Sequence, residues 1–399
     1  MDKNQTEQFI REHRTDDVRR LALASHPQGV DIQYALTQIS GWQAAMAKIP
    51  LWADTDCIIY PRHLPMEQCT SQHIAEFKAG YVESLIGKGF RMADLTGGFG
   101  VDCYFISRNA SHAIYNEISG ELSDIVSDNY RTLNCDIETH CKDAAELLST
   151  LPDDSLDLIY LDPARRDGAG RKLVSISDCQ PDVKALQDNL LRVASHVMVK
   201  LSPMLDISRA LTELRNVSRI LIIGLDGECK ELVFILQRGY TEEPVIEAVD
   251  INSNGTQEMT VSSAKSAENA LPLHVADPAL LQPGTFISEP SAPYMKSALF
   301  RTIAAATGTS LLHTDTHLYW SKSRPEHFPG RVFKLEGIIP FDKRSLSALS
   351  KTQANLSVRN FPETAPQLQQ KLKLKDGGTR YLIATTLSGG RRVLLDLSK

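Results

Sequence analysis

A stretch dense in glycine is the first candidate site. Residues 91–102 read Arg-Met-Ala-Asp-Leu-Thr-Gly-Gly-Phe-Gly-Val-Asp, an apolar strand end followed by a turn and the start of a helix. Glycine is needed where the backbone reaches positive φ or where a ligand approaches closely. Glu117 follows Asp94 by 23 residues, and an acid at about that distance suits the two hydroxyls of a ribose. The stretch therefore predicts a nucleotide-type ligand at the carboxyl edge of a parallel sheet.

Other apolar runs end in polar residues that could act at the same edge. A short third strand runs into Asp143, and residues 156–161 form a buried fourth strand that continues into Asp-Pro-Ala-Arg at 162–165. Lys200 ends a later strand. The carboxyl ends of parallel strands meet at one edge of the sheet, so these groups are expected beside the glycine turn. Simpler interpretations stay open, because an Asp before Pro can cap a turn and a lysine at a strand end can be solvated.

These motifs, in this order, resemble the class I S-adenosylmethionine (SAM)-dependent methyltransferases over residues 89–240. The resemblance implies an α/β fold with a Rossmann-like methyltransferase sheet and SAM as the cofactor. The alternation of strands and helices also favours a parallel sheet covered on both faces. One departure is Thr96, which stands where the family has the first glycine of Gly-x-Gly-x-Gly, and this puts the detail of the turn in doubt. The implied cofactor-binding residues are Lys78, Asp94, Thr96, Gly97, Gly98, Phe99, Gly100, Glu117, Ile118, Asp143 and Ala144.

The resemblance assigns separate parts of SAM to individual residues. Gly98 and Gly100 would lie under its methionine part, and Asp94 would help to hold its amino group. Glu117 would hold the ribose, and Asp143 would hold the adenine amino group.

The tip after the fourth strand is the implied catalytic group. Methyl transfer requires the alignment of nucleophile, methyl and sulfur. In family members that methylate exocyclic base nitrogens the tip ends in an aromatic residue, where this chain has Arg165; a guanidinium plane can also lie on a base. RNA uridine C5 methylation needs a cysteine nucleophile, and Leu201 stands at that place, so we expect a base nitrogen as the acceptor. The predicted catalytic residues are Asp162, Pro163, Arg165 and Lys200.

A narrower resemblance covers most of the chain. It is to a little-studied bacterial methyltransferase family with a helical N-terminus, a small ferredoxin-like insert and a THUMP-like C-terminal domain. This resemblance implies a connection to RNA or protein synthesis, but it does not identify a substrate. The matching stretches are residues 68–71, 77–79, 160–166, 227–231, 316–319 and 328–331.

Length and composition are those of an ordinary soluble protein with several domains. The chain has 399 residues, of which 42% are hydrophobic and 23% charged, and a chain of this length should hold two or three domains. Together with the resemblance, the pattern predicts four regions. They are a helical region at 1–88, the SAM-binding domain at 89–240, a ferredoxin-like α+β region at 241–325 and a basic THUMP-like domain at 326–399.

Charge is distributed unevenly along the chain. Residues 320–399 hold 15 Lys and Arg against 6 Asp and Glu, a balance of +9. Since the net charge of the whole chain is −6, residues 1–319 carry a net charge of −15. A basic module suits a polyanionic partner. We therefore predict RNA contact through residues 320–399, with a lysine-rich solvated surface as the simpler alternative.

Several other classes of protein are disfavoured. No window approaches the ~20 apolar residues of a membrane span, and the polar start lacks the apolar core of a signal peptide. The seven cysteines form no Cys-x-x-Cys pair, so neither a disulfide framework nor a zinc site is suggested. The sequence therefore predicts a cytoplasmic, metal-independent protein without a membrane partner.

The N-terminal region could cover the site or simply pack. Apolar spacing predicts helices through residues 1–88, with Trp42 as a bulky core residue. Gln68, Ser71 and Lys78 are the residues expected to face the cofactor. The region could form a lid over SAM, although packing against the sheet is the simpler interpretation.

Three further expectations concern residues 241–325. Residues 258–261 are predicted as a strand and residues 290–306 as one helix. Residues 313–317 alternate His-Thr-Asp-Thr-His, which would place His313, Asp315 and His317 on one face of a strand. Such a face could bind a metal, but a polar edge strand is the more common case.

Together these features predict a SAM-dependent methyltransferase that acts on a base nitrogen in RNA. One alternative is a methyltransferase that acts on protein or on a small molecule. Another is a SAM- and RNA-binding protein without catalysis, because no stacking aromatic follows Asp162.

Overall fold

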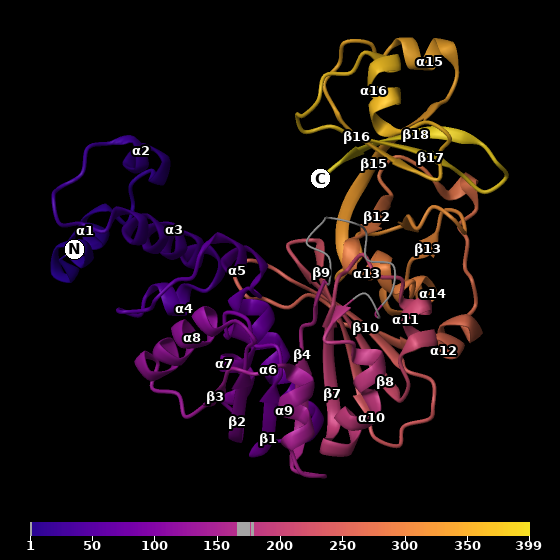
Figure 1. The fold of residues 1–399 in the computed structure, drawn as a ribbon. Coiled ribbons are helices and arrows are strands. Elements are labelled where there is room, and N and C mark those ends of the chain that lie inside the picture. The colour runs from indigo at the N-terminus through magenta and orange to yellow at the C-terminus, as the bar shows by residue number, and fades with distance from the viewer. Residues whose placement is uncertain (1, 166–175, 177–178) are drawn as a thin grey trace. The chain divides into compact units, whose positions relative to one another are not determined.

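The computed structural model describes residues 2–165, 176 and 179–399 (Figure 1). Residue contacts divide the chain into two compact units. The first comprises residues 1–218 and 232–242, and the second comprises residues 219–231 and 243–399. The four-region division predicted from the sequence stays a prediction.

The first unit alternates helices and strands after its N-terminal helices. Its helices are α1 (Lys3–His13), α2 (Val18–Leu23), α3 (Ile32–Lys48), α4 (Pro50–Ala53), α5 (His63–Gln68), α6 (Gln72–Ile86), α7 (Val101–Ser107), α8 (Gly120–Thr132), α9 (Ala144–Thr150), α10 (Val183–Val193) and α11 (Ile207–Glu213). Its strands are β1 (Phe90–Asp94), β2 (Ala110–Asn116), β3 (Glu138–His140), β4 (Leu156–Leu161), β5 (Ala164–Arg165), β6 (Cys179–Gln180), β7 (Ala194–Leu201) and most of β9 (Glu228–Gln237).

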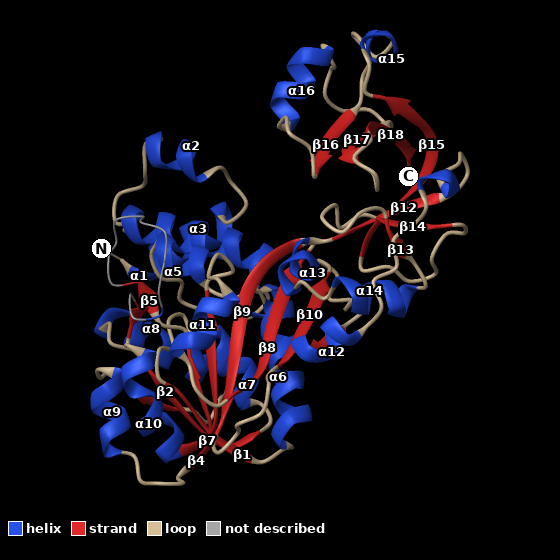
Figure 2. Cartoon of the chain, turned by 90° about the vertical axis from the view of Figure 1, so that its right-hand side faces the viewer, coloured by secondary structure: helices blue, strands red, loops and turns tan. Residues whose placement is uncertain are grey.

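The main sheet of the first unit has the predicted parallel topology. Its hydrogen-bonded order is β9-β7-β4-β1-β2-β3, with β9 antiparallel to β7 and the other pairs parallel. Figure 2 shows α9 and α10 on one side of these strands and α6 and α7 on the other. Asp94 lies opposite Tyr160, and Leu161 lies opposite Val199. The carboxyl ends of β1, β4 and β7 therefore come level, which brings their terminal residues together.

The N-terminal region is helical, as predicted, but its buried tryptophan is not the expected one. Trp42 is only half-buried, and its indole Nε1 donates to Ala53 O at 3.0 Å. Trp52 is fully buried and packs edge-on against Phe99, with ring centroids 5.0 Å apart. The short helix α4 (Pro50–Ala53) carries this second tryptophan into the core, a placement that helical periodicity in the longer α3 could not predict.

The second unit holds further strands and a separate seven-stranded sheet. Its helices are α12 (Lys265–Ala270), η2 (Pro278–Leu280), α13 (Ala292–Ser297), α14 (Phe300–Thr307), α15 (Lys343–Ser347) and α16 (Ala365–Leu372). Its strands are most of β8 (Val217–Leu225), β10 (Val245–Ile251), β11 (Val261–Ala264), β12 (Phe286–Pro290), β13 (Ser310–Leu311), β14 (Tyr319–Ser321), β15 (Gly330–Pro340), β16 (Asn355–Arg359), β17 (Tyr381–Thr386) and β18 (Arg392–Ser398). The seven-stranded order is β13-β14-β12-β15-β18-β17-β16.

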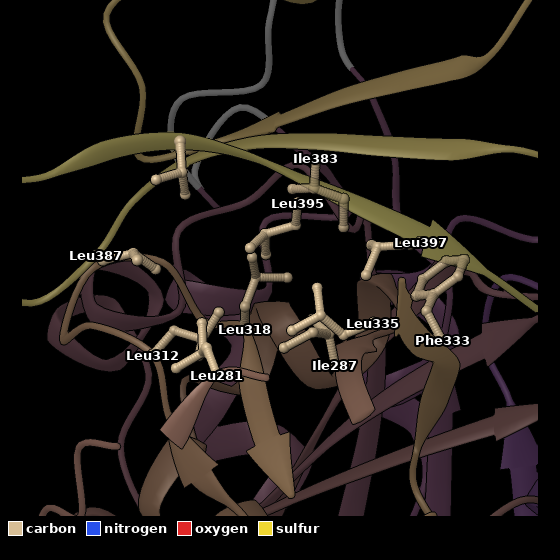
Figure 3. Packing of buried hydrophobic residues seen from close by; sticks show 11 residues of the cluster. Leu281, Ile287, Leu312, Leu318, Phe333, Leu335, Ile383, Leu387, Leu395 and Leu397 are labelled. Carbon is tan, nitrogen blue, oxygen red and sulfur yellow. The ribbon is translucent and has the colours of Figure 1, made fainter. Parts of the chain in front are cut away.

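The C-terminal elements follow one another as strand, helix, strand, helix and hairpin. β16 and β17 are parallel and are joined through α16, while β17 and β18 form an antiparallel hairpin. Leucine and isoleucine side chains from these and neighbouring strands gather in one apolar cluster (Figure 3). Its members include Ile287, Leu318, Phe333, Leu335, Ile383, Leu395 and Leu397.

Three local expectations were wrong. The predicted helix at 290–306 is two helices, α13 and α14, because Ala298 between them has a left-handed φ of 54°. Residues 258–260 lie outside any strand, and β11 begins only at Val261. Residues 313–317 form a turn rather than a strand, and His317 stacks on Phe300 with ring centroids 3.8 Å apart.

The described residues form neither a metal-binding cluster nor a membrane-spanning helix. No group of three His, Cys, Asp or Glu side chains in this part of the chain is placed to hold a metal ion. Over the same residues, no helix combines the length and the apolar character needed to cross a bilayer.

Candidate functional site

The glycine turn after β1 is shaped by close packing on one side and open space on the other. A Cβ at Gly97 would lie 2.0 Å from the Tyr115 ring, so no larger residue fits there. Gly98 has a φ of +54°, and a Cβ there would meet no atom within 4 Å. The Tyr115 hydroxyl donates to Gly98 O at 2.6 Å and fixes the turn from below. The turn therefore presents backbone to an open surface, as a ligand cradle requires.

Glu117 lies at the end of β2 and is held by backbone N–H groups. Its Oε2 accepts from Gly98 N at 3.0 Å, and its Oε1 accepts from Ser119 N at 2.9 Å. These bonds fix the carboxylate beside the glycine turn, where the sequence predicts recognition of ribose hydroxyls. The next residue, Ile118, leaves 63% of its surface exposed, which offers an apolar contact beside the acid.

Asp94, at the end of β1, has an unpaired oxygen. The residue is only 1% exposed, its Oδ1 accepts from Thr96 N at 3.0 Å, and its Oδ2 has no hydrogen-bond partner among the described residues. Burial raises the pKa of this carboxyl well above its ordinary value. A buried carboxylate oxygen without a donor is costly. The ammonium group of the predicted cofactor would supply that donor, so this residue fits the group.

The contacts of Thr96 explain why a threonine can stand in place of the family's first glycine. Its Oγ1 accepts a hydrogen bond of 2.6 Å from Asp162 N. In addition, Leu95 N donates to Tyr160 O at 3.1 Å. The side chain at this position therefore ties the cofactor turn to the tip of β4, a link that glycine could not make.

Asp162 and Lys200 form an ion pair at the tip of the sheet. Lys200 Nζ lies 2.6 Å from Asp162 Oδ2, and the lysine side chain is 12% exposed. The two residues follow β4 and end β7, strands whose ends are level, so the sequence placed them at the correct edge. The ion pair was not predicted, because its partners lie 38 residues apart.

Behind this tip lies a buried cluster of charge. Lys78 is fully buried, and its Nζ lies 2.8 Å from Asp102 Oδ1 and 3.2 Å from the Tyr160 hydroxyl. The Tyr160 and Thr70 hydroxyls donate to Asp102 Oδ2 at 2.8 and 2.7 Å. Burial opposes the charged form of Asp102, but the nearby charges of Lys78 and Lys200 outweigh it and lower the pKa of the carboxyl.

Sequence reasoning missed most of this cluster. It predicted Lys78 near the cofactor but did not predict the hydrogen bond from Lys78 to the Tyr160 hydroxyl. A signal for Asp102 was present, since it is the one charged residue in the otherwise apolar α7 segment Val-Asp-Cys-Tyr-Phe-Ile-Ser.

The other predicted cofactor residues have identifiable structural roles. Asp143 caps α9, where its Oδ1 accepts from Ala145 N at 2.8 Å, and the neighbouring Ala144 is buried. Phe99 is also buried, packed against Trp52 as described above. These contacts show how the three residues are packed, and their role in cofactor binding stays a prediction.

The rest of the tip is described only in part. Pro163 is buried. Arg165 lies in β5, which pairs with β6 through Arg165 and Cys179. Arg166 follows in the sequence motif and lies outside the described residues.

Three sequence families match different parts of the chain. A family described as conserved hypothetical protein 95 matches residues 78–218. A ferredoxin-like domain matches residues 286–329, and a THUMP domain-like family matches residues 330–396. The predicted bounds of these two regions, 241–325 and 326–399, stay predictions.

One solved structure is similar over the whole chain. It is the crystal structure of a proposed methyltransferase from Porphyromonas gingivalis W83, with 29% sequence identity and a TM-score of 0.82. The match covers 100% of this chain and 99% of the other. No curated protein matches the chain.

More distant structures match parts of the chain. A proposed class I SAM-dependent methyltransferase from Listeria monocytogenes has 10% identity, covers 62% of this chain and 93% of its own, and has a TM-score of 0.38. A proposed RNA methyltransferase from Pyrococcus horikoshii has 19% identity, covers 38% and 70%, and has a TM-score of 0.28. Similarities this weak carry no argument about the present chain.

Proposed function

We propose that the chain, a class I SAM-dependent methyltransferase with a THUMP-like C-terminal domain, methylates a base nitrogen in RNA. The observation that carries this proposal is the position of Asp162. Its backbone is tied to the cofactor turn through Thr96, and its carboxylate is paired with Lys200. A polar group fixed between cofactor and substrate is what methyl transfer to nitrogen needs.

The residues of the glycine turn would hold the cofactor. Asp94 Oδ2 would accept a hydrogen bond from the ammonium group, and the fixed carboxylate of Glu117 would accept hydrogen bonds from the ribose hydroxyls. Asp143 would reach the adenine amino group, with Ile118 against the ring. When bound, SAM supplies an electrophilic methyl group on a sulfonium sulfur.

The charge at the tip favours a neutral acceptor. Asp162 carries a negative charge and Lys200 a positive one, and they are 2.6 Å apart. The pair offers little net attraction to a cationic lysine or arginine acceptor on a protein. An ionised carboxylate can still accept a hydrogen bond from a neutral amine N–H. Asp162 would thereby orient the nitrogen lone pair toward the methyl group and stabilise the N–H until its proton leaves to water.

Basic residues in the C-terminal module would bind the RNA. The backbones of Lys351, Lys373 and Lys375 are adjacent, because Lys351 N donates to Lys373 O at 3.0 Å and Lys375 N donates to Thr352 O at 2.9 Å. No ion pair involves these three lysines within the part of the chain that the structure describes. Three exposed lysines on adjacent backbone segments suit a phosphate backbone. A cytoplasmic location belongs to the same proposal.

One experiment tests the proposed acceptor. Purified full-length protein is incubated with methyl-labelled SAM and with total RNA from cells that lack the gene, and the nucleosides are then read by mass spectrometry. Label in one N-methylated base is the expected result. Label only in protein or small molecules would overturn the RNA assignment. SAM binding without any methyl transfer would instead favour a non-catalytic binding protein.

A further inference from the structure

Thr70 lies where the N-terminal helices meet the catalytic edge. Its side chain is buried, and it lies two residues before the start of α6. The family match to the catalytic domain begins only at residue 78, so Thr70 belongs to the segment in front of it. We propose that Thr70 is a positioning residue for methyl transfer, because its hydroxyl holds Lys200 against Asp162. This inference rests on the proposed function.

The Thr70 hydroxyl contacts Asp102, Lys200 and Lys78, and these three bonds match one donor and two acceptor positions. It donates to Asp102 Oδ2 at 2.7 Å. It accepts from Lys200 Nζ at 3.3 Å and from Lys78 Nζ at 3.4 Å. A hydroxyl provides one donor and two lone pairs, so a single threonine can serve all three groups at once.

The direction of these bonds follows from the charges. Asp102 is kept ionised by the nearby lysines and can only accept, so the hydroxyl proton points to it. The lone pairs of Thr70 must then face the two ammonium groups. The result is a chain of alternating charge, Lys78, Asp102, Lys200 and Asp162, in which Thr70 is the neutral link between the buried pair and the pair at the tip.

The backbone that carries Thr70 is itself held in place. Lys48, at the end of α3, donates from Nζ to Met66 O at 3.1 Å, to Cys69 O at 3.0 Å and also to Glu67 O. A lysine at this position caps the carbonyl groups at the end of α5. The N-terminal helices therefore fix the position of Thr70, and through it the orientation of the Lys200 ammonium group.

A set of three variants isolates this role. Thr70→Val keeps the shape but removes the hydroxyl, and Thr70→Ser keeps the hydroxyl. Thr37→Val is the matched control, because among the described residues the Thr37 hydroxyl bonds only to Gln33 O of its own helix, at 3.0 Å. For each, we would measure kcat and KM for RNA methylation, SAM affinity by calorimetry, and the 15N ammonium resonance of Lys200, assigned with Lys200→Met.

The proposal predicts that Thr70→Val changes kcat and the Lys200 resonance but not KM or SAM affinity. Thr70→Val should lower kcat about 10- to 100-fold, as expected for a lost hydrogen bond to charged groups, with SAM affinity and KM within about twofold of wild type. Its Lys200 resonance should shift. Thr70→Ser and Thr37→Val should behave as wild type in all four readouts.

Two results would overturn the role of Thr70. One is wild-type kcat with an unmoved Lys200 resonance in Thr70→Val. The other is a loss of kcat that Thr70→Ser does not restore. If Thr70→Val does not fold, Lys48→Met tests the same series of contacts from Lys48 through Thr70 to Lys200. This variant should lower kcat while leaving SAM affinity unchanged. If wild-type protein methylates no RNA, the proposed function fails, and the Lys200 resonance still decides whether Thr70 holds Lys200.

Discussion

The two units treat buried charge in different ways. In the first unit, Lys78, Asp94 and Asp102 lie buried at the carboxyl edge of the sheet, and one oxygen of Asp94 has no partner in the described structure. In the second unit, the main cluster of buried side chains shown in Figure 3 is apolar. Buried charge costs free energy unless it is fully paired. The second unit also buries acids, including Asp250, Glu268 and Glu289, and these have hydrogen-bond or ion-pair partners. The contrast is therefore between an unpaired carboxylate oxygen at the sheet edge of the first unit and paired acids together with an apolar cluster in the second.

One of the buried acids of the second unit is held by two ion pairs. Glu289 on β12 is 1% exposed and forms ion pairs with Arg331 and Arg359. Arg331 lies on the neighbouring strand β15 and Arg359 on β16 of the same sheet. This carboxylate joins strands of the sheet, in contrast to the partly unpaired Asp94.

The largest effect should come from the tip of the first unit. Asp162→Ala removes the group that orients the acceptor, and we expect kcat for RNA methylation to fall about 10³-fold. SAM affinity should stay within a few-fold of wild type, because the cofactor turn keeps its own contacts. Methyl incorporation and calorimetry measure the two quantities, and substantial turnover in this variant would remove Asp162 from the site.

A substitution in the second unit should lower stability rather than activity. Leu395→Ala empties part of the cluster in Figure 3, where Leu395 is fully buried, and should cost about 2–5 kcal/mol of stability. Leu23→Ala is the matched control, since Leu23 is 90% exposed and should leave the melting temperature unchanged. An equal melting temperature for both variants would contradict the contrast between the units.

Replacement of Glu117 tests which residue binds the ribose of SAM. Glu117→Ala removes the carboxylate that Gly98 N and Ser119 N orient, and SAM affinity should fall about 10- to 100-fold, since hydrogen bonds to a charged group contribute ~1.5–3 kcal/mol. Glu121→Ala, a nearby acid of exposed α8, serves as the control. Unchanged affinity in the Glu117 variant would dismiss the ribose assignment.

Asp94 should make both stability and binding depend on pH. Its raised pKa means that the folded protein binds a proton more tightly than the unfolded chain, whose carboxyl has a pKa near 3.8. Its contribution to stability is therefore greatest at low pH and is lost as pH rises through the folded pKa. Relative to Asp94→Asn, cofactor-free wild type should lose melting temperature as the pH rises above the ordinary carboxyl pKa and through the raised pKa of Asp94.

The same shift predicts that SAM binding releases a proton. The ammonium group favours the ionised form of Asp94, so affinity should rise with pH in wild type but much less in Asp94→Asn. Calorimetry in buffers of different ionisation enthalpy measures the proton directly. Equal pH profiles for the two proteins would contradict the link between Asp94 and the ammonium group.

The smallest single effects are expected at the lysines of the C-terminal module. Lys375→Ala should weaken RNA binding only a few-fold and reduce the slope of log K against log[salt] by up to about one. Lys3→Ala, on the exposed first helix, is the control. An unchanged slope after replacement of Lys351, Lys373 and Lys375 together would exclude them from the RNA surface.

The sequence was most informative where a signal is local. Strand ends such as Asp94 and Asp162 could be found because an apolar run stops there, and the C-terminal elements followed from regular apolar spacing and paired glycines. Contacts between distant residues could not be found in this way. Thr70 and Lys200 lie 130 residues apart, and the local sequence around neither residue indicates a contact with the other.

The wrong expectations have the same cause. Residues 313–317 alternate like a strand, but the stacking of His317 on Phe300 holds them in a turn. Similarly, residues 290–306 have helical spacing throughout, but Ala298 adopts a left-handed conformation that divides the helix. Tertiary packing decides both cases, and a pattern read along the chain does not contain it.

The central claim is that the edge around Asp162 methylates a base nitrogen in RNA. Its most direct test compares wild type and Asp162→Ala on the same total RNA with methyl-labelled SAM, followed by mass spectrometry of the nucleosides. The account predicts one labelled N-methyl nucleoside with wild type and almost none with the variant, although both proteins bind SAM. Label on a carbon or on ribose, or equal label with both proteins, would contradict it.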